Sequence, residues 1–291
     1  MGSLVVKTLL IDGRPDGLRV VELMNRTIRC TVFPRPDLER VLARAEAKRP
    51  GVYILVGAAA TESSELEVYV GEGDPVDDRL KSHGVKKDFW STGLVFTSSD
   101  DNLTKTQIQF LEAKLVAVIE KAAKATLDQN RPTSPSISEA DGAVASALLE
   151  DILLMIGSAG HNFHRSDTVP ADALETIPTT TRFTYATKGA KAHMVIANSR
   201  YVVLESSTAV AEPPPYGLSQ TFVVNKREEL KKAGILTEQD ESLLRFTKNV
   251  EFETPSGAAS VIAGGGVNGW LIWKRDSDGR ALKEIEEAGG A

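Results

Sequence analysis

The sequence predicts an α+β protein in which a small antiparallel sheet flanked by helices is followed by a second, small α+β domain. Segments rich in β-branched residues alternate with short turns near the start of the chain, and a long amphipathic helix follows them. Proline and small polar residues then separate a second set of short strands and helices. At 291 residues, the chain has room for about two domains.

Composition is that of a folded globular protein, with 42% hydrophobic and 25% charged residues. A net charge of −6 argues against a protein that coats nucleic acid by bulk charge, and leaves local basic groups as the route to such a partner. Cys30 is the only cysteine, which excludes an intrachain disulfide and a cysteine-based zinc site and favours a cytoplasmic location. We expect no membrane partner, because the sequence shows neither a signal-peptide pattern nor a long apolar run.

Residues 1–49 are expected to form an N-terminal strand extension and a helix. Three strand-like segments lie between Leu4 and Val32, separated by turn-forming residues. A short helix follows, with Asp37 as its N-cap and Pro50-Gly51 as its stop.

Residues 50–131 are expected to form a domain of their own. Val52 to Val56 and Leu66 to Val70 predict a hairpin, because two strand-like runs flank a small, acidic turn. Asp74-Pro75 opens a short helix, and the segment STGLVFTSS predicts a third strand. The strongest helix pattern in the chain then runs from Thr104 to Ala125.

The segment DQNRPTSPSIS predicts a domain boundary, and residues 132–181 are expected to hold a helix and a linker. That helix, Ser138 to Ile156, fits either half of the chain or a bridge between them. Residues 182–291 are expected to form the C-terminal α+β domain, in which GWLIWK is predicted as a strand. One of its helices carries four basic residues that form either a solvated face or a phosphate-contacting stripe: Lys226, Arg227, Lys231 and Lys232.

Glu112 stands out in the long helix because it shares a face with the apolar residues Ile108, Leu115 and Ile119. An isolated buried charge is very costly, so a carboxylate on that face must be paired or bound to a cation. The alternative is a position at the flank of the stripe, where the carboxylate reaches solvent or pairs with a lysine.

Two further pairs of residues carry chemistry. Arg79 and His83 are four residues apart in a predicted helix and share one face. Tyr53 and Tyr69 lie in the two strands of the hairpin, where both hydroxyls can point to one side. Taken singly, an Arg/His pair of this kind is more often solvated surface, and tyrosines at such positions are more often half-buried packing than chemistry.

In chain order, these residues resemble the GIY-YIG nuclease family. Gly51-Val52-Tyr53 and Tyr69-Val70-Gly71 match the family's two tripeptides, and Arg79, His83 and Glu112 follow in the family's order. The resemblance covers roughly residues 48 to 131, and the tail is similar to a small C-terminal domain of unknown function.

The resemblance implies a metal-dependent endonuclease that hydrolyses DNA phosphodiester bonds. It implies that Glu112 holds a single Mg²⁺ or Mn²⁺, that Arg79 contacts the scissile phosphate, and that a tyrosine is the general base. The implied catalytic residues are Tyr53, Tyr69, Arg79, His83 and Glu112, and the implied substrate-binding residues are Gly71 and Asn130.

Two features depart from the family pattern. Fifteen residues, Ile54 to Val68, separate the tripeptides, which requires a longer hairpin loop. Acidic residues, Glu72-Gly73-Asp74, follow the second tripeptide and repel phosphate unless a cation neutralises them. The alternative function is therefore a catalytically weak or inactive GIY-YIG-like module that binds nucleic acid or protein. The oligomeric state stays open.

Overall fold

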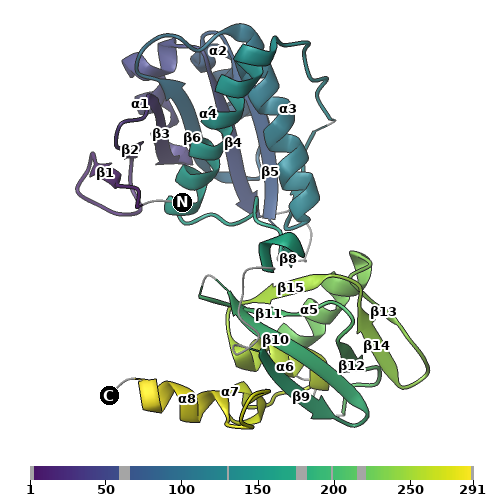
Figure 1. Ribbon diagram of the computed structural model, residues 1–291. Coiled ribbons are helices and arrows are strands. Elements are labelled where there is room, and N and C mark those ends of the chain that lie inside the picture. Colours follow the sequence, from purple (N-terminus) through teal and green to yellow (C-terminus); the bar gives the residue numbers. More distant parts are fainter. Residues whose placement is uncertain are drawn as a thin grey trace. The chain divides into compact units, whose positions relative to one another are not determined.

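The computed structural model describes residues 3–58, 66–129, 131–174, 182–197, 199–214 and 221–289. The chain divides into two compact units, Met1–Ser166 and Asp167–Ala291, and each has its own sheet and hydrophobic core (Figure 1). The expected α+β class is confirmed. Within the described ranges, no helix has both the length and the apolar character needed to cross a membrane.

The first unit is built on a seven-stranded sheet in the order β1-β2-β3-β6-β4-β5-β7. Neighbouring strands are antiparallel except for β5 and β7, which run parallel. Because β3 pairs with β6, the N-terminal strands and the predicted hairpin β4–β5 belong to one sheet. The strands are β1 (Val6–Leu10), β2 (Arg19–Leu23), β3 (Ile28–Pro34), β4 (Gly51–Ala58), β5 (Leu66–Gly73), β6 (Trp90–Ser98) and β7 (Ala125–Leu127).

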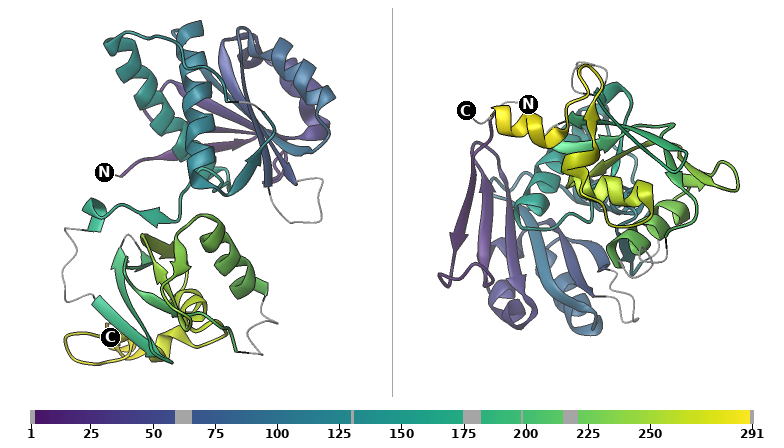
Figure 2. Two further views of the ribbon diagram at one scale, coloured as in Figure 1. Left: turned by 90° about the vertical axis from the view of Figure 1, so that its right-hand side faces the viewer. Right: turned by 90° about the horizontal axis from the view of Figure 1, so that it is seen from below.

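Helices cover both faces of this sheet (Figure 2). Helices α1 (Leu38–Leu42) and α2 (Val76–Lys86) share a core with the odd-numbered side chains of β4, including Tyr53. Helices α3 (Lys105–Ala122) and α4 (Glu139–Ser158) share a core with the even-numbered side chains, such as Ile54. Helix α4 therefore belongs to the first unit rather than bridging the two.

A side-chain cap in the sequence sets the start of α3, but not the start of α1. A capping box fixes the start of α3, in which the Thr104 hydroxyl accepts from the backbone N–H of Gln107 and the Gln107 side chain accepts from that of Thr104. The expected helix after Asp37 is much shorter, with α1 between the 3₁₀ turns Arg35–Asp37 and Ala45–Lys48. Asp37 makes no capping bond, because its carboxylate accepts from Arg40 instead.

The second unit contains a six-stranded sheet, in the order β16-β9-β10-β11-β15-β8, and a three-stranded sheet, in the order β12-β14-β13. Both pack around helices α5 and α6 in one core. The strands are β8 (Thr168–Val169), β9 (Arg182–Thr187), β10 (Ala190–Ala197), β11 (Arg200–Val203), β12 (Thr208–Val210), β13 (Leu236–Glu238), β14 (Leu243–Phe246), β15 (Asn249–Phe252) and β16 (Lys274–Arg275). The helices are η3 (Asp172–Leu174), α5 (Thr221–Lys232), α6 (Pro255–Ala263), α7 (Gly269–Ile272) and α8 (Leu282–Gly289).

The predicted strand GWLIWK is wrong, because its first residues form the single-turn helix α7. Asn268 caps this turn by accepting a hydrogen bond from the Trp270 N–H (3.1 Å). Gly269 lies so close to the backbone that a Cβ there would be 2.2 Å from the Pro255 carbonyl oxygen. Trp273 is fully buried and donates to the same oxygen (3.0 Å), so tertiary packing overrides the strand pattern.

Candidate functional site

The β4–β5 hairpin brings the two predicted tyrosines together. Tyr53 lies opposite Gly71 and Leu55 lies opposite Tyr69, so the tyrosines are diagonal neighbours on one face, with ring centroids 6.1 Å apart. A Cβ on Gly71 would be 2.4 Å from the Tyr53 Cζ atom. The Tyr53 ring therefore lies across Gly71, and the glycine of the second tripeptide is needed for packing.

Helix α2 brings His83 against both tyrosines. The Tyr53 hydroxyl is hydrogen-bonded to His83 Nδ1 (2.7 Å), and the Tyr69 ring lies edge-on to the imidazole, with centroids 5.0 Å apart. Tyr53 is completely buried, whereas Tyr69 keeps 9% of its surface exposed. The three side chains form one connected cluster, called here the tyrosine–histidine cluster.

Burial shifts the proton affinities in this cluster. It is the main reason why the pKa values of Tyr53 and Tyr69 are both raised. A hydrogen bond from Tyr53 opposes this rise at Tyr69 but adds to it at Tyr53, so Tyr69 is the easier of the two to ionise. Burial, followed by the charges of Arg79 and Lys87, lowers the pKa of His83 and favours a neutral imidazole near pH 7.

Arg79 lies one turn before His83 in α2 and is exposed. Its Cγ atom is 3.2 Å from where a Cβ on Gly73 would be, so this second glycine lets the arginine pack against the end of β5. No residue in the described part of the chain forms a hydrogen bond or ion pair with its guanidinium. Arg79 is therefore available to an anionic ligand.

Glu112 is half-buried on α3, between residues that are fully buried in the core. Burial, followed by repulsion from Glu72, raises its pKa to about 7, and the charges of Arg79 and Lys105 act in the opposite direction. Like Arg79, Glu112 has no hydrogen-bond or ion-pair partner among the residues described. The side chain is thus a carboxylate whose charge is poorly compensated within the unit.

Arg79 and Glu112 are carried by helices on opposite faces of the sheet, so the five implied catalytic residues come from both faces and not, as a shared phosphate site would require, from one. Helix α2 packs on the face that carries the tyrosines, and α3 packs on the other. Strand β7 pairs with β5 only along Leu66–Val68, so no strand in the described part of the chain covers the edge of β5 from Tyr69 onward. The charge of Glu112 contributes to the raised pKa values of both tyrosines, and the charge of Arg79 opposes the rise at Glu112, so we take this edge as the candidate site.

The acidic turn after Tyr69, Glu72 to Asp78, has two of its four carboxylates paired with lysines. Lys105 donates to Glu72 (2.5 Å), and Lys48 donates to Asp77. The repulsion that this turn would exert on a phosphate is therefore smaller than its sequence indicates.

Lys87 and Asp128 are members of the site that the sequence analysis missed. The Lys87 ammonium lies 4.1 Å from the centre of the Tyr69 ring and 2.7 Å from the Asp128 carboxylate. The signal available in the sequence is that Lys87 follows His83 by four residues, one helical turn. Asn130 lies outside the described residues.

The side chains at the candidate site could hold a divalent cation only weakly. The described residues contain no group of three or more His, Cys, Asp or Glu side chains that could hold a metal. Mg²⁺, however, keeps several waters and is commonly held by one or two carboxylates together with substrate phosphates. The unpaired carboxylate of Glu112 supplies the hard oxygen that such a site requires.

In the second unit, the basic stripe is not free to contact phosphate. Arg227 is buried and donates to the carbonyls of Val261, Val210 and Ala211. Lys226 donates to Asp167 and to Glu229, and Lys231 pairs with Glu228. Arg227 and Lys226 are thus engaged within the unit, whereas Lys231 and Lys232 are exposed, so the four residues do not form one phosphate-contacting stripe.

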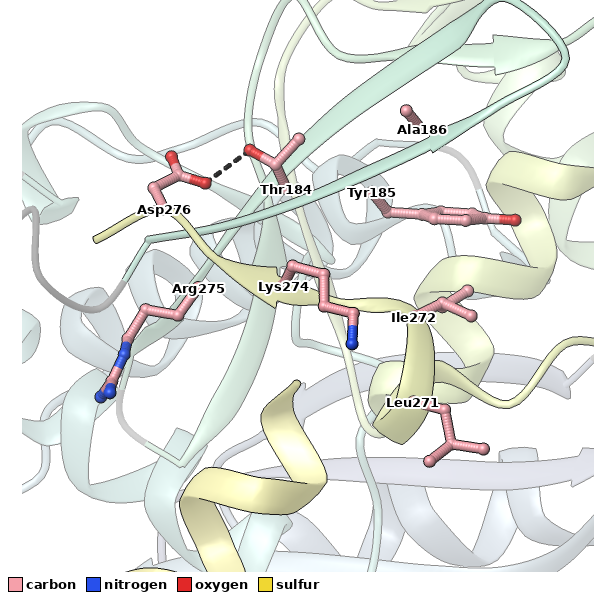
Figure 3. Close-up of a pocket in the computed structure, with 8 residues that line it drawn as sticks. All are labelled: Thr184, Tyr185, Ala186, Leu271, Ile272, Lys274, Arg275 and Asp276. Atoms are coloured by element: carbon pink, nitrogen blue, oxygen red, sulfur yellow. Dashed lines mark hydrogen bonds between the residues drawn. The ribbon is translucent and has the colours of Figure 1, made fainter. Parts of the chain in front are cut away.

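The second unit also has a shallow pocket of about 520 Å³ beside β9, β16 and α7 (Figure 3). The Thr184 hydroxyl donates to Asp276 (2.6 Å) on one side of the pocket, and Leu271 and Ile272 lie on the other. None of the predicted site residues lines it.

Comparison with known proteins identifies only the second unit. Residues 183–286 match a family model described as "Domain of unknown function (DUF4357)". This agrees with the resemblance of the tail to a small domain of unknown function. No curated protein and no solved structure matches the chain.

Proposed function

We propose that the first unit is a metal-dependent endonuclease that hydrolyses DNA phosphodiester bonds. One observation carries the proposal. Among the described residues, the Arg79 guanidinium and the half-buried Glu112 carboxylate have no partner, and their charges act on the pKa values of the two tyrosines in the hydrogen-bonded tyrosine–histidine cluster. The order of these residues in the chain resembles the GIY-YIG nuclease family, and this resemblance adds the substrate class.

Phosphodiester hydrolysis requires a deprotonated water, compensation of the charge on the phosphoryl oxygens, and help for the departing 3′ oxygen. Tyr53 or Tyr69 would act as the base only after its hydroxyl has lost its proton to solvent, and the resulting phenolate would then accept the proton of the attacking water. The neutral imidazole of His83 orients the Tyr53 hydroxyl through their 2.7 Å hydrogen bond. Arg79 donates to the scissile phosphate through its planar fork of N–H groups.

Glu112 would hold the divalent cation, and Mg²⁺ or Mn²⁺ bound there would supply Lewis-acid stabilisation of negative charge on the leaving oxygen. Only the ionised Glu112 carboxylate would bind the cation, and burial and the charge of Glu72 disfavour that ionised form.

A cleavage panel tests the proposal. Labelled single-stranded, duplex and flap DNA are each incubated with the purified chain in Mg²⁺, in Mn²⁺ and in chelator. We expect metal-dependent cuts in at least one substrate. If none is cut under any condition, the endonuclease proposal fails.

The alternative is a catalytically inactive module of the same fold that binds nucleic acid or protein. Two observations favour it: the net charge of −6 and the engagement of Lys105 and Lys48 by the acidic turn, which removes two cations from substrate binding. It predicts retention of labelled DNA or of a protein partner without cleavage.

A further inference from the structure

Strand β9 of the second unit has an edge that is only partly paired. The strand runs to Thr187, but its neighbour β16 pairs only with Phe183 and Thr184, because the chain before Lys274 turns away as helix α7. No strand in the described part of the chain pairs with this edge from Tyr185 onward. The shallow pocket of about 520 Å³ is lined by residues of this open edge and of α7 (Figure 3).

The backbone of Ala186 faces the open edge. In an antiparallel sheet, the N–H and C=O groups of every second residue point to the same neighbouring strand. The Asp276 N–H donates to the Arg182 carbonyl (2.9 Å), so Arg182 and the residues at even numbers after it face the side of β16. Ala186 is exposed and lies beyond the end of β16. Its donor and its acceptor are therefore available to an added strand.

Two of the three charged side chains that line the pocket have partners in the unit. Asp276 accepts from the Thr184 hydroxyl (2.6 Å), and Arg275 donates to Asp278 (3.0 Å). Lys274, the third, is exposed, and its ammonium pairs with no described residue. Figure 3 shows its side chain extending along the pocket toward Leu271. Among the described residues, the charge left for a ligand of this pocket is thus positive.

The far side of the pocket is apolar. Leu271 has 49% of its surface exposed, and Ile272 is half-buried. A single exposed leucine is ordinary, but this one lies beside an open strand edge and an unpaired lysine. A ligand that covers Leu271 with an apolar group gains the free energy of removing both surfaces from water.

We propose that this pocket binds the carboxyl-terminal end of an extended peptide whose last side chain is apolar. The peptide pairs antiparallel with β9 at Ala186, packs its last side chain against Leu271 and Ile272, and places its carboxylate beside Lys274. Addition of a strand to a sheet edge and capture of a terminal carboxylate are both known modes of peptide recognition. The inference concerns the second unit and does not depend on the nuclease activity proposed for the first.

The ligand is a chain terminus because β16 already occupies the edge at Thr184. A strand added at Ala186 cannot continue past this point, so its end lies beside Lys274. A strand antiparallel to β9, as β16 is, brings its carboxyl end there, whereas a parallel strand brings its amino end. The lysine ammonium attracts a carboxylate and repels an amino terminus, so charge selects the antiparallel direction.

The test is binding of synthetic hexapeptides to the full chain. The peptides carry fluorescein at the amino end, end in Leu, Val or Phe, and are each made with a free carboxylate and with a carboxyl-terminal amide. Affinity is measured by fluorescence anisotropy. The site is located by NMR of the chain labelled with nitrogen-15 alanine, in which the Ala186 signal is assigned with Ala186→Gly.

The variants separate the charge, the apolar wall and the matched control. Lys274→Met removes the charge and keeps the stem, Lys274→Arg keeps the charge, and Leu271→Ser removes the apolar wall. Lys191→Met is the control, because Lys191 is an exposed lysine directly opposite Ala186 on β10 and does not line the pocket. Circular dichroism checks that each variant folds.

We expect at least one free-carboxylate peptide to bind and to shift the Ala186 amide signal. Its amide form should bind about tenfold more weakly or worse. Lys274→Met should cost the carboxylate form a similar factor and leave the amide form nearly unchanged, and Leu271→Ser should weaken both forms. Lys274→Arg and Lys191→Met should bind within about twofold of the parent.

Three results would overturn the inference. The first is that no peptide of the panel moves the Ala186 signal at millimolar concentration. The second is that carboxylate and amide forms bind equally. The third is that Lys274→Met weakens binding no more than Lys191→Met does. Cleavage of DNA, or its absence, bears only on the function proposed for the first unit, so the two proposals fail separately.

Discussion

Two helical arginines, one in each unit, show opposite uses of the same side chain. Arg227 in α5 is buried, and three backbone carbonyls of its own unit accept its hydrogen bonds. Arg79 in α2 is exposed, and no described residue pairs with it. The first arginine has its donors satisfied by the fold and is structural, whereas the second has donors available to a ligand.

The largest expected effect is in the first unit, and it tests whether the charged side chains without partners there act on a ligand. Glu112→Gln keeps the shape of the side chain and removes its charge, so it should abolish metal-dependent cleavage, because a neutral amide is a poor ligand for a hard cation. Arg79→Ala should lower kcat roughly 10²-fold or more through loss of charge stabilisation. Both are measured in the cleavage panel with circular dichroism as a check of folding.

Glu120→Gln is the matched control for Glu112→Gln, because Glu120 lies on the same helix, is exposed and pairs with Arg131. It should cut like the parent. If Glu112→Gln cuts equally fast, the activity arises at another site.

The second effect tests the structural arginine. Arg227→Met should destabilise the chain by about 3 kcal/mol, because it leaves buried carbonyls without a donor at roughly 1 kcal/mol each. Urea unfolding measures this loss. Lys232→Met, at an exposed position of the same helix, should change the free energy of unfolding by less than about 0.5 kcal/mol. Equal effects of the two substitutions would mean that the carbonyl bonds of Arg227 contribute little.

A smaller effect tests whether Gly71 is needed for the packing of Tyr53. Gly71→Ala places a Cβ 2.4 Å from the Tyr53 ring, so the ring must move and the unit should lose about 1–3 kcal/mol of stability. Gly142→Ala is the control with the opposite sign. In helix α4, its Cβ would meet only Ile137 at 3.6 Å, and the change should stabilise the helix by roughly 0.5–1 kcal/mol. Thermal unfolding of both variants checks the signs.

The last effect concerns pH and needs no DNA. The pKa of Glu112 is raised from 4.5 to about 7, so between these values the folded chain binds more protons than the unfolded chain, and its contribution to stability falls as pH rises. Glu112→Gln lacks this loss. Its melting temperature without metal should therefore exceed that of the parent by an amount that grows from about pH 4.5 to 7 and then levels off.

A melting-temperature difference between Glu112→Gln and the parent that stays constant across this range would contradict the raised pKa. Addition of Mg²⁺ above pH 7 should stabilise the parent and leave Glu112→Gln unchanged. These measurements distinguish a carboxylate kept for a ligand from one kept for the fold.

The parts of the fold that could be predicted are those with strong local patterns. The hairpin around Tyr53 and Tyr69 follows from two β-branched runs, and helix α3 follows from its apolar period and the Thr104–Gln107 capping box. The short strands β12–β14 have only three or four residues each, too few for an alternating pattern to emerge. The helix at Trp270 depends on a contact of Gly269 with Pro255, which no local pattern contains.

The sequence by itself determined the α+β class, the order of the chemistry-bearing residues and the face that Tyr53 and Tyr69 share, because helical and strand periods act over neighbouring residues. Only the tertiary structure decided which charged side chains have partners within the fold. In the sequence, Lys226 and Arg227 are basic residues of a helix, as Arg79 is. The fold gives Lys226 and Arg227 partners from distant segments of the second unit, whereas no described residue pairs with Arg79. Lys87 lies over Tyr69 because a strand edge holds Asp128 beside it. Burial and pairing depend on contacts between residues far apart in the chain, and these set the pKa values and the free donors of the candidate site.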